Sequence, residues 1–245
     1  MRVKRKVERL GLGWSNLPRA LQREMDEVRE LYEQAADQGH EVAMANIAGL
    51  YEHGQGVAQS YVKARDWLER AAEGGFVDAQ FVLGSYYHDG REGVAIDLPR
   101  ARMWTEKAAA QGHAVAQYNL GCMHQQGQGG PQDFKRAREL YELAAAQGDA
   151  GAQFNLGHMH REGTGGPQDF TRARELYELA AAQGHAYSQY SLGQMHRDGQ
   201  GGPQDFTRAR ELYELAAAQG DAGAQFNLGI MHRDGEGGPQ DSRGR

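Results

Sequence analysis

An apolar stripe with a helical period recurs along most of the chain. It is clearest in residues 149–184, where five apolar residues fall at i, i+3, i+4, i+7 and i+8, one face of an amphipathic helix. Asp169 follows the helix breaker Pro167 and is a good N-cap, and Gly184 suits a left-handed residue just past a helix end. The pattern predicts a helix over about 169–183, here called the B helix, with the stripe Ala173, Leu176, Tyr177, Ala180 and Ala181.

A second helix, here called the A helix, is predicted from the N-cap Asp149 to Gly163, because Ala152, Leu156 and Met159 fall at i, i+4 and i+7. Gly157 lies in its middle, where glycine costs about 1 kcal/mol relative to alanine. We therefore expect a neighbouring helix to approach closely at this point. The equivalent position is small in every repeat: Ala48, Gly84, Gly121, Gly193 and Gly229.

The two helices repeat along the chain. Residues 165–184 recur unchanged at 201–220 and with one substitution at 129–148, and the glycines that end the B helices are 36 residues apart except for one step of 37. One helix pair cannot bury its own stripe, so stacked neighbours must build a continuous core. Equivalent residues of different repeats share a slot, which carries the number of the corresponding residue in 149–184. The glycines that end the B helices are Gly39, Gly75, Gly112, Gly148, Gly184 and Gly220.

The repeated pattern A-x-F-N-L-G-x-M-H-x-x-G-x-G-G-P-Q-D-F-x-R-A-R-x-L-Y-x-x-A-A-x-Q-G resembles the Sel-1-like repeat, a relative of the tetratricopeptide repeat, over about residues 28–241. Ala48 replaces the glycine, Ser60 replaces the loop aspartate, and histidine replaces the family's usual aromatic residue at 124, 160, 196 and 232. We predict an all-α fold, a right-handed superhelical α/α solenoid of about five complete 36-residue helix pairs with half repeats at both ends.

The repeat pattern also predicts a division of the chain. We expect a basic, disordered tail over 1–16, a capping helix over 17–39 that is a B helix without its A partner, five repeats over 40–220, a half repeat over 221–234 and a disordered tail over 235–245. The last A helix lacks half its cover. We expect it to be frayed, buried against another chain, or continued in a longer array, and the pattern favours the last.

Charge and composition narrow the function classes. The net charge is −6 with both signs interspersed, which gives no reason to expect nucleic acid or an anionic membrane surface as a partner. No apolar run approaches the ~20 residues of a membrane span, and residues 1–14 lack the apolar centre of a signal peptide. Cys122 is the single cysteine, so no internal disulfide framework forms. We expect a cytoplasmic protein.

Four features invite a chemical role. The glycine-rich loops such as GTGG join two helices, whereas a dinucleotide loop follows a strand. Ser60-Tyr-Val-Lys63 matches the acylating motif S-x-x-K, but S-D-N and K-T-G are absent and Ser60 falls at an N-cap. Cys122 has no catalytic neighbours in sequence. We expect packing rather than metal binding from the histidine row, and no catalytic residue, metal or cofactor; the row is His124, His160, His196 and His232.

The A-helix positions left outside the core are slots 151, 155, 158 and 162. The residue at slot 158 changes even among near-identical repeats. Such variation is expected of a recognition surface, but also of a surface under no constraint. Asparagine amides offer a donor and an acceptor to a peptide backbone. The predicted peptide-binding residues are Asn46, Asn119, Asn155, His158, Tyr187, Ser191, Gln194 and Asn227.

The sequence therefore favours a non-catalytic scaffold or adaptor that binds a protein or peptide along the groove of the solenoid, as the adaptors of the resembled family do. Self-association through the uncovered last A helix is also open. One alternative is a hydrolase acting on β-lactam or cell-wall fragments through Ser60. Another is a structural spacer within a larger repeat protein.

Overall fold

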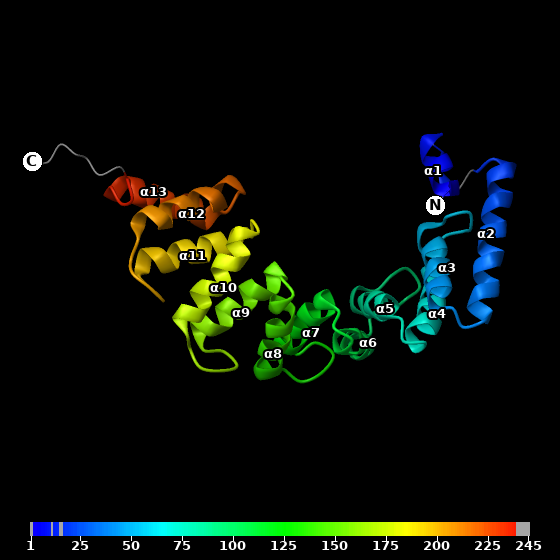
Figure 1. The fold of residues 1–245 in the computed structure, drawn as a ribbon, viewed down its shortest axis with the longest axis horizontal. Helices are drawn as coiled ribbons and strands as arrows, with labels where there is room; N and C mark the ends of the chain where they lie inside the picture. Colours follow the sequence, from blue (N-terminus) through cyan, green and yellow to red (C-terminus); the bar gives the residue numbers. More distant parts are fainter. Residues whose placement is uncertain (1, 11, 15–16, 239–245) are drawn as a thin grey trace, which may run out of the picture. The chain divides into compact units, whose positions relative to one another are not determined.

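The computed structural model describes residues 2–10, 12–14 and 17–238. Within those ranges the chain forms thirteen α-helices and no strand, apart from one isolated bridge between Arg91 and Val94. The helices follow one another in antiparallel pairs (Figure 1). The prediction of an all-α solenoid built from helix pairs is confirmed.

The chain divides into two compact units, which we describe separately: residues 1–116 with 127–131, and residues 117–126 with 132–245. The first unit contains α1 (Arg2–Arg9), α2 (Arg19–Asp37), α3 (Glu41–His53), α4 (Tyr61–Glu73), α5 (Val77–Asp89) and α6 (Leu98–Ala110). The second contains most of α7 (Ala114–Gln126), then α8 (Phe134–Ala146), α9 (Ala150–Glu162), α10 (Phe170–Ala182), α11 (Ala186–Asp198), α12 (Phe206–Ala218) and α13 (Ala222–Asp234).

The predicted helix ends are confirmed within a residue or two. In α9 the Asp149 carboxylate accepts from the backbone N–H of Ala152 (2.8 Å), and in α10 Asp169 accepts from that of Arg172 (2.9 Å). Such caps satisfy backbone donors that a helix leaves open at its start. Gly163 and Gly184 have φ of 71° and 86°, the left-handed values that favour glycine past a helix end.

The mid-helix glycines allow paired helices to touch. A Cβ built on Gly157 of α9 would lie 2.8 Å from the Tyr177 ring of α10 and 3.3 Å from the Ala173 carbonyl oxygen. Gly193 meets Tyr213 at 2.7 Å and Gly121 meets Tyr141 at 2.6 Å in the same way. These tyrosines are fully buried. The predicted close approach of a neighbouring helix is confirmed, and the structure shows that the tyrosine of the paired B helix occupies the space left by the glycine.

Three polar contacts recur along the second unit. The Gln183 amide that follows α10 donates to Gln153 Oε1 of α9 (2.8 Å), and Gln153 donates to the Ala145 carbonyl of the preceding B helix (3.3 Å). Arg138 of α8 places Nη2 2.9 Å from His160 Nδ1 of α9. The first contact joins the two helices of one repeat, and the other two join neighbouring repeats. The apolar pattern alone does not reveal them.

The N-terminal region differs from its prediction. We expected residues 1–16 to be a disordered tail, but Arg2–Arg9 form α1, and its Val3 and Val7 are buried with Leu21, Met25 and Leu50. Spaced four residues apart, these two valines form one helical face that the surrounding basic residues obscure in the sequence. The capping helix predicted from Leu17 to Gln38 is present as α2.

Of the tail predicted over 235–245, residues 239–245 lie outside the described part of the chain. Gly235 closes α13 in the left-handed conformation, with φ of 73°.

Candidate protein-interaction surface

The predicted peptide-binding residues lie on one face of the odd-numbered helices, α3 to α13. Asn46, His158 and Tyr187 are exposed, and Asn119, Asn155 and Gln194 are half-buried. Every residue at slot 158 keeps some exposure: Gly49, Ser85, Cys122, His158, Gln194 and Ile230. A ligand on this face can therefore reach the most variable slot of the repeat.

Two of the eight residues are placed differently. Ser191 and Asn227 hold slot 155 in α11 and α13, but they are only 8% and 7% exposed. Slot 155 adjoins the tyrosine of the B helix in the preceding repeat, as Ser191 adjoins Tyr177 and Asn227 adjoins Tyr213, so a small or well-packed side chain there is covered. These two residues belong to the floor of the face rather than to its contact surface.

An aromatic row runs beside these residues, and our list of binding residues does not include it. Slot 154 is aromatic in five repeats and none of the five rings is fully buried. The signal was present in the sequence as aromatic residues at the repeat spacing, next to slot 155. The row consists of Phe81 in the first unit and of Tyr118, Phe154, Tyr190 and Phe226 in the second.

The widest aromatic cluster lies where α9 meets α11. The Phe154 ring centre lies 5.1 Å from that of His185, 6.1 Å from that of Tyr187 and 5.7 Å from that of Tyr177. Tyr187 is 64% exposed, so its ring extends this cluster to the surface. Exposed aromatic rings of this kind supply large contact area at low entropic cost.

His185, one member of this cluster, is hydrogen-bonded to the backbone. Its Nδ1 accepts from the backbone N–H of Ser188 (3.2 Å) at the start of α11. Burial lowers the pKa of His185 below its ordinary value. The ring is therefore favoured as a neutral acceptor that fixes the start of the helix carrying Tyr187.

A polar cleft lies beside the aromatic row in the second unit. It encloses about 360 Å³ and is open to solvent. Slot 158 contributes Gln194, and slot 162 contributes Glu162 and Asp198 from successive repeats. Its other lining residues are Arg161, Gln168, Phe170 and Gln200. The variable slots thus border a cleft of mixed charge.

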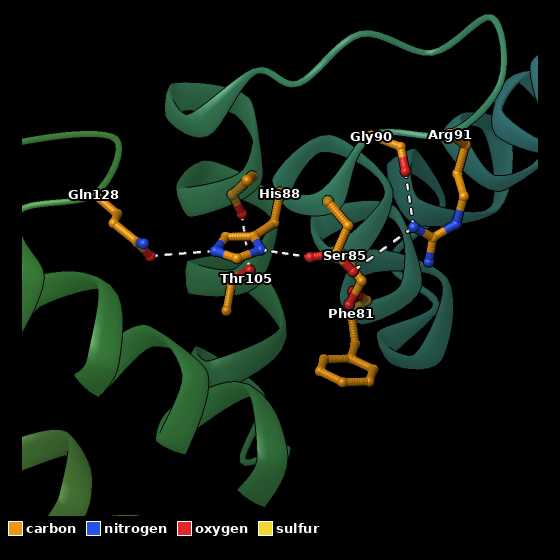
Figure 2. Close-up of polar contacts among 9 residues, drawn as sticks. Phe81, Ser85, His88, Gly90, Arg91, Thr105 and Gln128 are labelled. Atoms are coloured by element: carbon orange, nitrogen blue, oxygen red, sulfur yellow. Dashed lines mark hydrogen bonds and ion pairs between the residues drawn. The ribbon is translucent and has the colours of Figure 1, made fainter.

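In the first unit the same face is seen on α5. Figure 2 shows Phe81 and Ser85 at slots 154 and 158, with the Ser85 hydroxyl donating to the Phe81 carbonyl (3.3 Å). His88 lies one turn further on, where Nδ1 contacts Asp89 (2.6 Å) and Nε2 contacts Gln128 Oε1 (3.2 Å). The Asp89 carboxylate raises the pKa of His88.

Cys122 at slot 158 lies within a small hydrogen-bonded group. Its Sγ lies 3.3 Å from the Tyr141 hydroxyl oxygen, and the Asn155 amide approaches to 3.9 Å. The single hydroxyl proton of Tyr141 is donated to Gln125 Oε1 (2.6 Å). Burial raises the pKa of neighbouring Tyr118 to about 12. These contacts connect slot 158 of one repeat with slot 155 of the next.

The remaining chemical candidates have structural contacts. Ser60 Oγ accepts from the backbone N–H of Lys63 (3.3 Å) as the N-cap of α4, and Lys63 Nζ lies 5.1 Å from the centre of the Tyr51 ring. His160 and His196 are each in contact with an arginine of the preceding B helix. Across the described ranges, no three His, Cys, Asp or Glu side chains are grouped to hold a metal ion.

No helix in the described part of the chain is both long enough and apolar enough to span a bilayer.

The family model of the Sel1 repeat matches the sequence seven times, at residues 29–40, 42–76, 77–113, 114–149, 150–185, 186–221 and 222–243. The matches follow the helix pairs seen in the structure. This chain is a Sel1 repeat protein. The family resemblance predicted from the sequence is confirmed. Sel1 repeat proteins commonly serve as protein-interaction scaffolds.

Solved structures of other Sel1 repeat proteins are similar. The protein c5321, a protective antigen of uropathogenic Escherichia coli with an SLR fold, is 34% identical, with a TM-score of 0.78. The match covers 84% of this chain and 44% of that chain. A Sel1 repeat protein from Oxalobacter formigenes is 32% identical, with a TM-score of 0.71, over 82% of this chain and 79% of its own. None of the curated proteins matches the sequence.

Proposed function

We propose that this Sel1 repeat protein is a non-catalytic scaffold that binds an extended peptide segment of a partner protein on the A-helix face. One observation carries the proposal. Slot 158, which keeps some exposure and varies even among the repeats whose B helices α8, α10 and α12 are near-identical, lies beside a row of accessible aromatic rings. A constant frame with a variable, aromatic-rich face is the arrangement by which solenoids recognise partners.

The chemistry of the face favours a peptide with spaced apolar side chains. The ring of Tyr187 and the partly exposed ring of Phe154 would cover such a side chain, and the half-buried amide of Asn155 would hydrogen-bond the peptide backbone. The charged rim of the neighbouring cleft, with Arg161 and Glu162, would select polar residues beside it. Aromatic anchors of this kind carry most of the energy in protein interfaces.

A displayed library of random peptides, selected against the whole chain, tests the proposal. Affinities of the selected peptides are then measured by calorimetry for wild type, Tyr187→Ala, Asn155→Ala and Leu179→Ala. Leu179 is the matched control, because it is 51% exposed but lies on a B helix. We expect Tyr187→Ala to weaken binding about tenfold or more, equal to about 1.4 kcal/mol, and Leu179→Ala to leave it unchanged.

Two results would contradict the proposal. Selection that yields no peptide above background would remove the binding function. Peptides that bind the Tyr187→Ala variant as well as wild type but lose affinity for Leu179→Ala would move the site to the B helices.

A further inference from the structure

The aromatic row at slot 154 is not the same from one repeat to the next. Its first four rings each lie against the start of the following A helix. We call this contact a joint, formed by slot 154 of one repeat with slots 149 and 151 of the next. Phenylalanine at slot 154 goes with histidine at slot 149, and tyrosine goes with aspartate, so two kinds of joint alternate along the chain. The joints are Phe81 with His113, Tyr118 with Asp149, Phe154 with His185, and Tyr190 with Asp221.

The inner support of the row is constant in the second unit. The ring centres of Tyr118, Phe154 and Tyr190 lie 6.0, 5.7 and 5.9 Å from that of the buried B-helix tyrosine in the same repeat. These supporting residues are Tyr141, Tyr177 and Tyr213. The joints therefore differ only on the side that faces the next repeat, where a ligand on the A-helix face would lie.

In the tyrosine joints the ring occupies the room of a missing side chain. Slot 151 is glycine in both, and a Cβ built on Gly151 would lie 3.1 Å from Tyr118 Cε2. A Cβ on Gly223 would lie 3.0 Å from Tyr190 Cε2 in the same way. A side chain in slot 151 would press on the ring, so glycine and tyrosine belong together at these joints.

The Tyr190 joint offers one hydrogen-bond donor and one acceptor. The Tyr190 hydroxyl accepts from Gln194 Nε2 (2.8 Å), and within the described part of the chain neither its proton nor Gln194 Oε1 has a partner. Both side chains are half-buried, and Gln194 lines the polar cleft of about 360 Å³. An amide or hydroxyl side chain of a ligand satisfies both groups, whereas an apolar side chain would leave them buried and unpaired.

The Tyr118 joint carries polar groups in the corresponding places. Cys122 holds slot 158, as Gln194 does in its repeat, and interacts with Tyr118. The Asn155 amide of the next repeat lies 3.9 Å from Cys122 Sγ. Cys122 and Asn155 are both only half-buried. A ligand that reaches this joint therefore meets hydrogen-bonding groups, as it does at Tyr190.

The Phe154 joint between them presents carbon surface. Slot 151 is Tyr187 here, and its ring centre lies 6.1 Å from that of Phe154 and 6.0 Å from that of His185. Phe154 has no polar side-chain atom, and His185 Nδ1 is directed to the backbone N–H and the hydroxyl of Ser188 (3.2 and 2.9 Å). An apolar side chain that packs on these rings is buried without leaving a polar group unpaired.

We propose that the A-helix face of the second unit selects its peptide in alternation. An apolar side chain lies at the Phe154 joint, and side chains with amide or hydroxyl groups lie at the Tyr118 and Tyr190 joints. The inference rests on the proposed scaffold function and names the side chain that each position takes. Three identical joints would let a bound peptide slip by one repeat. Alternating joints fix its register, because a slipped peptide would bury an unpaired polar group.

One combined variant exchanges the kind of the central joint. Phe154→Tyr, His185→Asp and Tyr187→Gly together give it the residues that the joints on both sides carry. The supporting B-helix tyrosine is the same in all three repeats, so we expect the variant to fold, and thermal unfolding checks this. A second variant, Tyr190→Phe, removes one hydroxyl and keeps the ring on its support. The control is Leu179→Ala on a B helix.

The readout is side-chain preference rather than affinity alone. In a peptide selected on the wild-type chain, each position is replaced in turn by leucine, glutamine and alanine, and binding is measured by calorimetry. Double-mutant cycles between these peptides and the variants assign each peptide position to a joint. On wild type we expect the central anchor to prefer leucine over glutamine, and its neighbours glutamine over leucine, each by about tenfold.

The combined variant should bind more weakly overall and reverse the preference at the central anchor alone. Tyr190→Phe should remove the preference for glutamine at one neighbouring anchor, and Leu179→Ala should change none. Peptides that bind with the same side-chain class at every anchor would overturn the alternation and leave the scaffold function standing. So would a combined variant that keeps the wild-type preference. If that variant melts well below wild type, Tyr190→Phe decides, and an unchanged preference there refutes the inference. Selection that yields no peptide removes both proposals.

Discussion

In the α5–α6 pair and in the α9–α10 pair, the backbones of the two helices come equally close at a glycine, but different side chains lie over that glycine. A Cβ on Gly84 or on Gly157 would lie 3.3 Å from a carbonyl oxygen of the paired helix. Over the glycine, α6 presents Thr105 where α10 presents Tyr177. α5 in turn carries a tyrosine, Tyr86, in the slot where α9 has Met159.

A buried tyrosine thus occurs on the A helix of one pair and on the B helix of the other. Tyr86 and Tyr177 are 1% and 0% exposed, but the Tyr86 ring lies beside that of Tyr61 in the preceding B helix α4 (6.3 Å between ring centres), whereas Tyr177 lies over Gly157 of its own repeat. The comparison teaches that the close backbone approach requires the glycine, while the side chain over it can be a tyrosine or a threonine.

The largest expected effects come from removing these rings. Tyr177→Ala and Tyr86→Ala should each lower the free energy of unfolding by about 3–5 kcal/mol, the usual range for a buried aromatic residue. Tyr187→Ala, at an exposed ring, should change it by less than about 0.5 kcal/mol. Urea unfolding followed by circular dichroism measures all three. A small effect for Tyr86→Ala beside a large one for Tyr177→Ala would show that the two buried rings do not contribute equally to stability.

The next effect compares two glycines in the same slot. Gly157→Ala inserts a methyl group against Tyr177 and should destabilise the protein by about 1–3 kcal/mol. Gly229→Ala meets nothing within 4 Å and should stabilise α13 by up to about 1 kcal/mol through helix propensity. Thermal unfolding at low protein concentration gives both values. Equal signs for the two variants would show that packing does not distinguish the slots.

A smaller effect distinguishes the tyrosine hydroxyls of two near-identical B helices. The Tyr141 hydroxyl donates to Gln125 Oε1 and lies beside Cys122 Sγ, whereas that of Tyr177 is buried with no hydrogen-bond partner within 3.5 Å among the described residues. Tyr141→Phe should cost about 0.5–1.5 kcal/mol. Tyr177→Phe should be neutral or stabilising in the same unfolding assay, and a loss equal to that of Tyr141→Phe would contradict this assignment.

The last and smallest expected effect concerns how the folding stability changes with pH at two histidines. Burial and the Arg138 guanidinium lower the pKa of His160, so its contribution to stability is complete above the ordinary histidine value near 6.5 and is lost as pH falls through it. Asp89 raises the pKa of His88, so its contribution is complete below about 6.5 and is lost as pH rises through the folded value.

Melting temperatures measured from pH 5 to pH 8 test both signs. We expect His160→Gln to reduce the loss of stability on the acid side and His88→Gln to reduce the loss on the alkaline side. The reverse assignment would show that neighbouring charges other than Arg138 and Asp89 control these two rings.

The candidate surface was only partly accessible to sequence reasoning. Repeat spacing placed Asn155, His158 and Tyr187 on one face, where the structure leaves Asn155 partly exposed and the other two exposed. It also placed Ser191 and Asn227 there, and both are buried. Whether a side chain in slot 155 is covered depends on the packing around the B-helix tyrosine, which slot numbering does not contain.

The sequence by itself determined the period, the helix ends and the contact glycines, because these depend on local spacing, capping side chains and residues with unusual backbone freedom. Tertiary structure alone decided what covers each helix. Gly157 and Gly229 stand in the same local sequence, AQFNLG, yet one is sealed by a tyrosine and the other is open. Cover comes from a neighbouring helix, so identical repeats acquire different surfaces according to their place in the array.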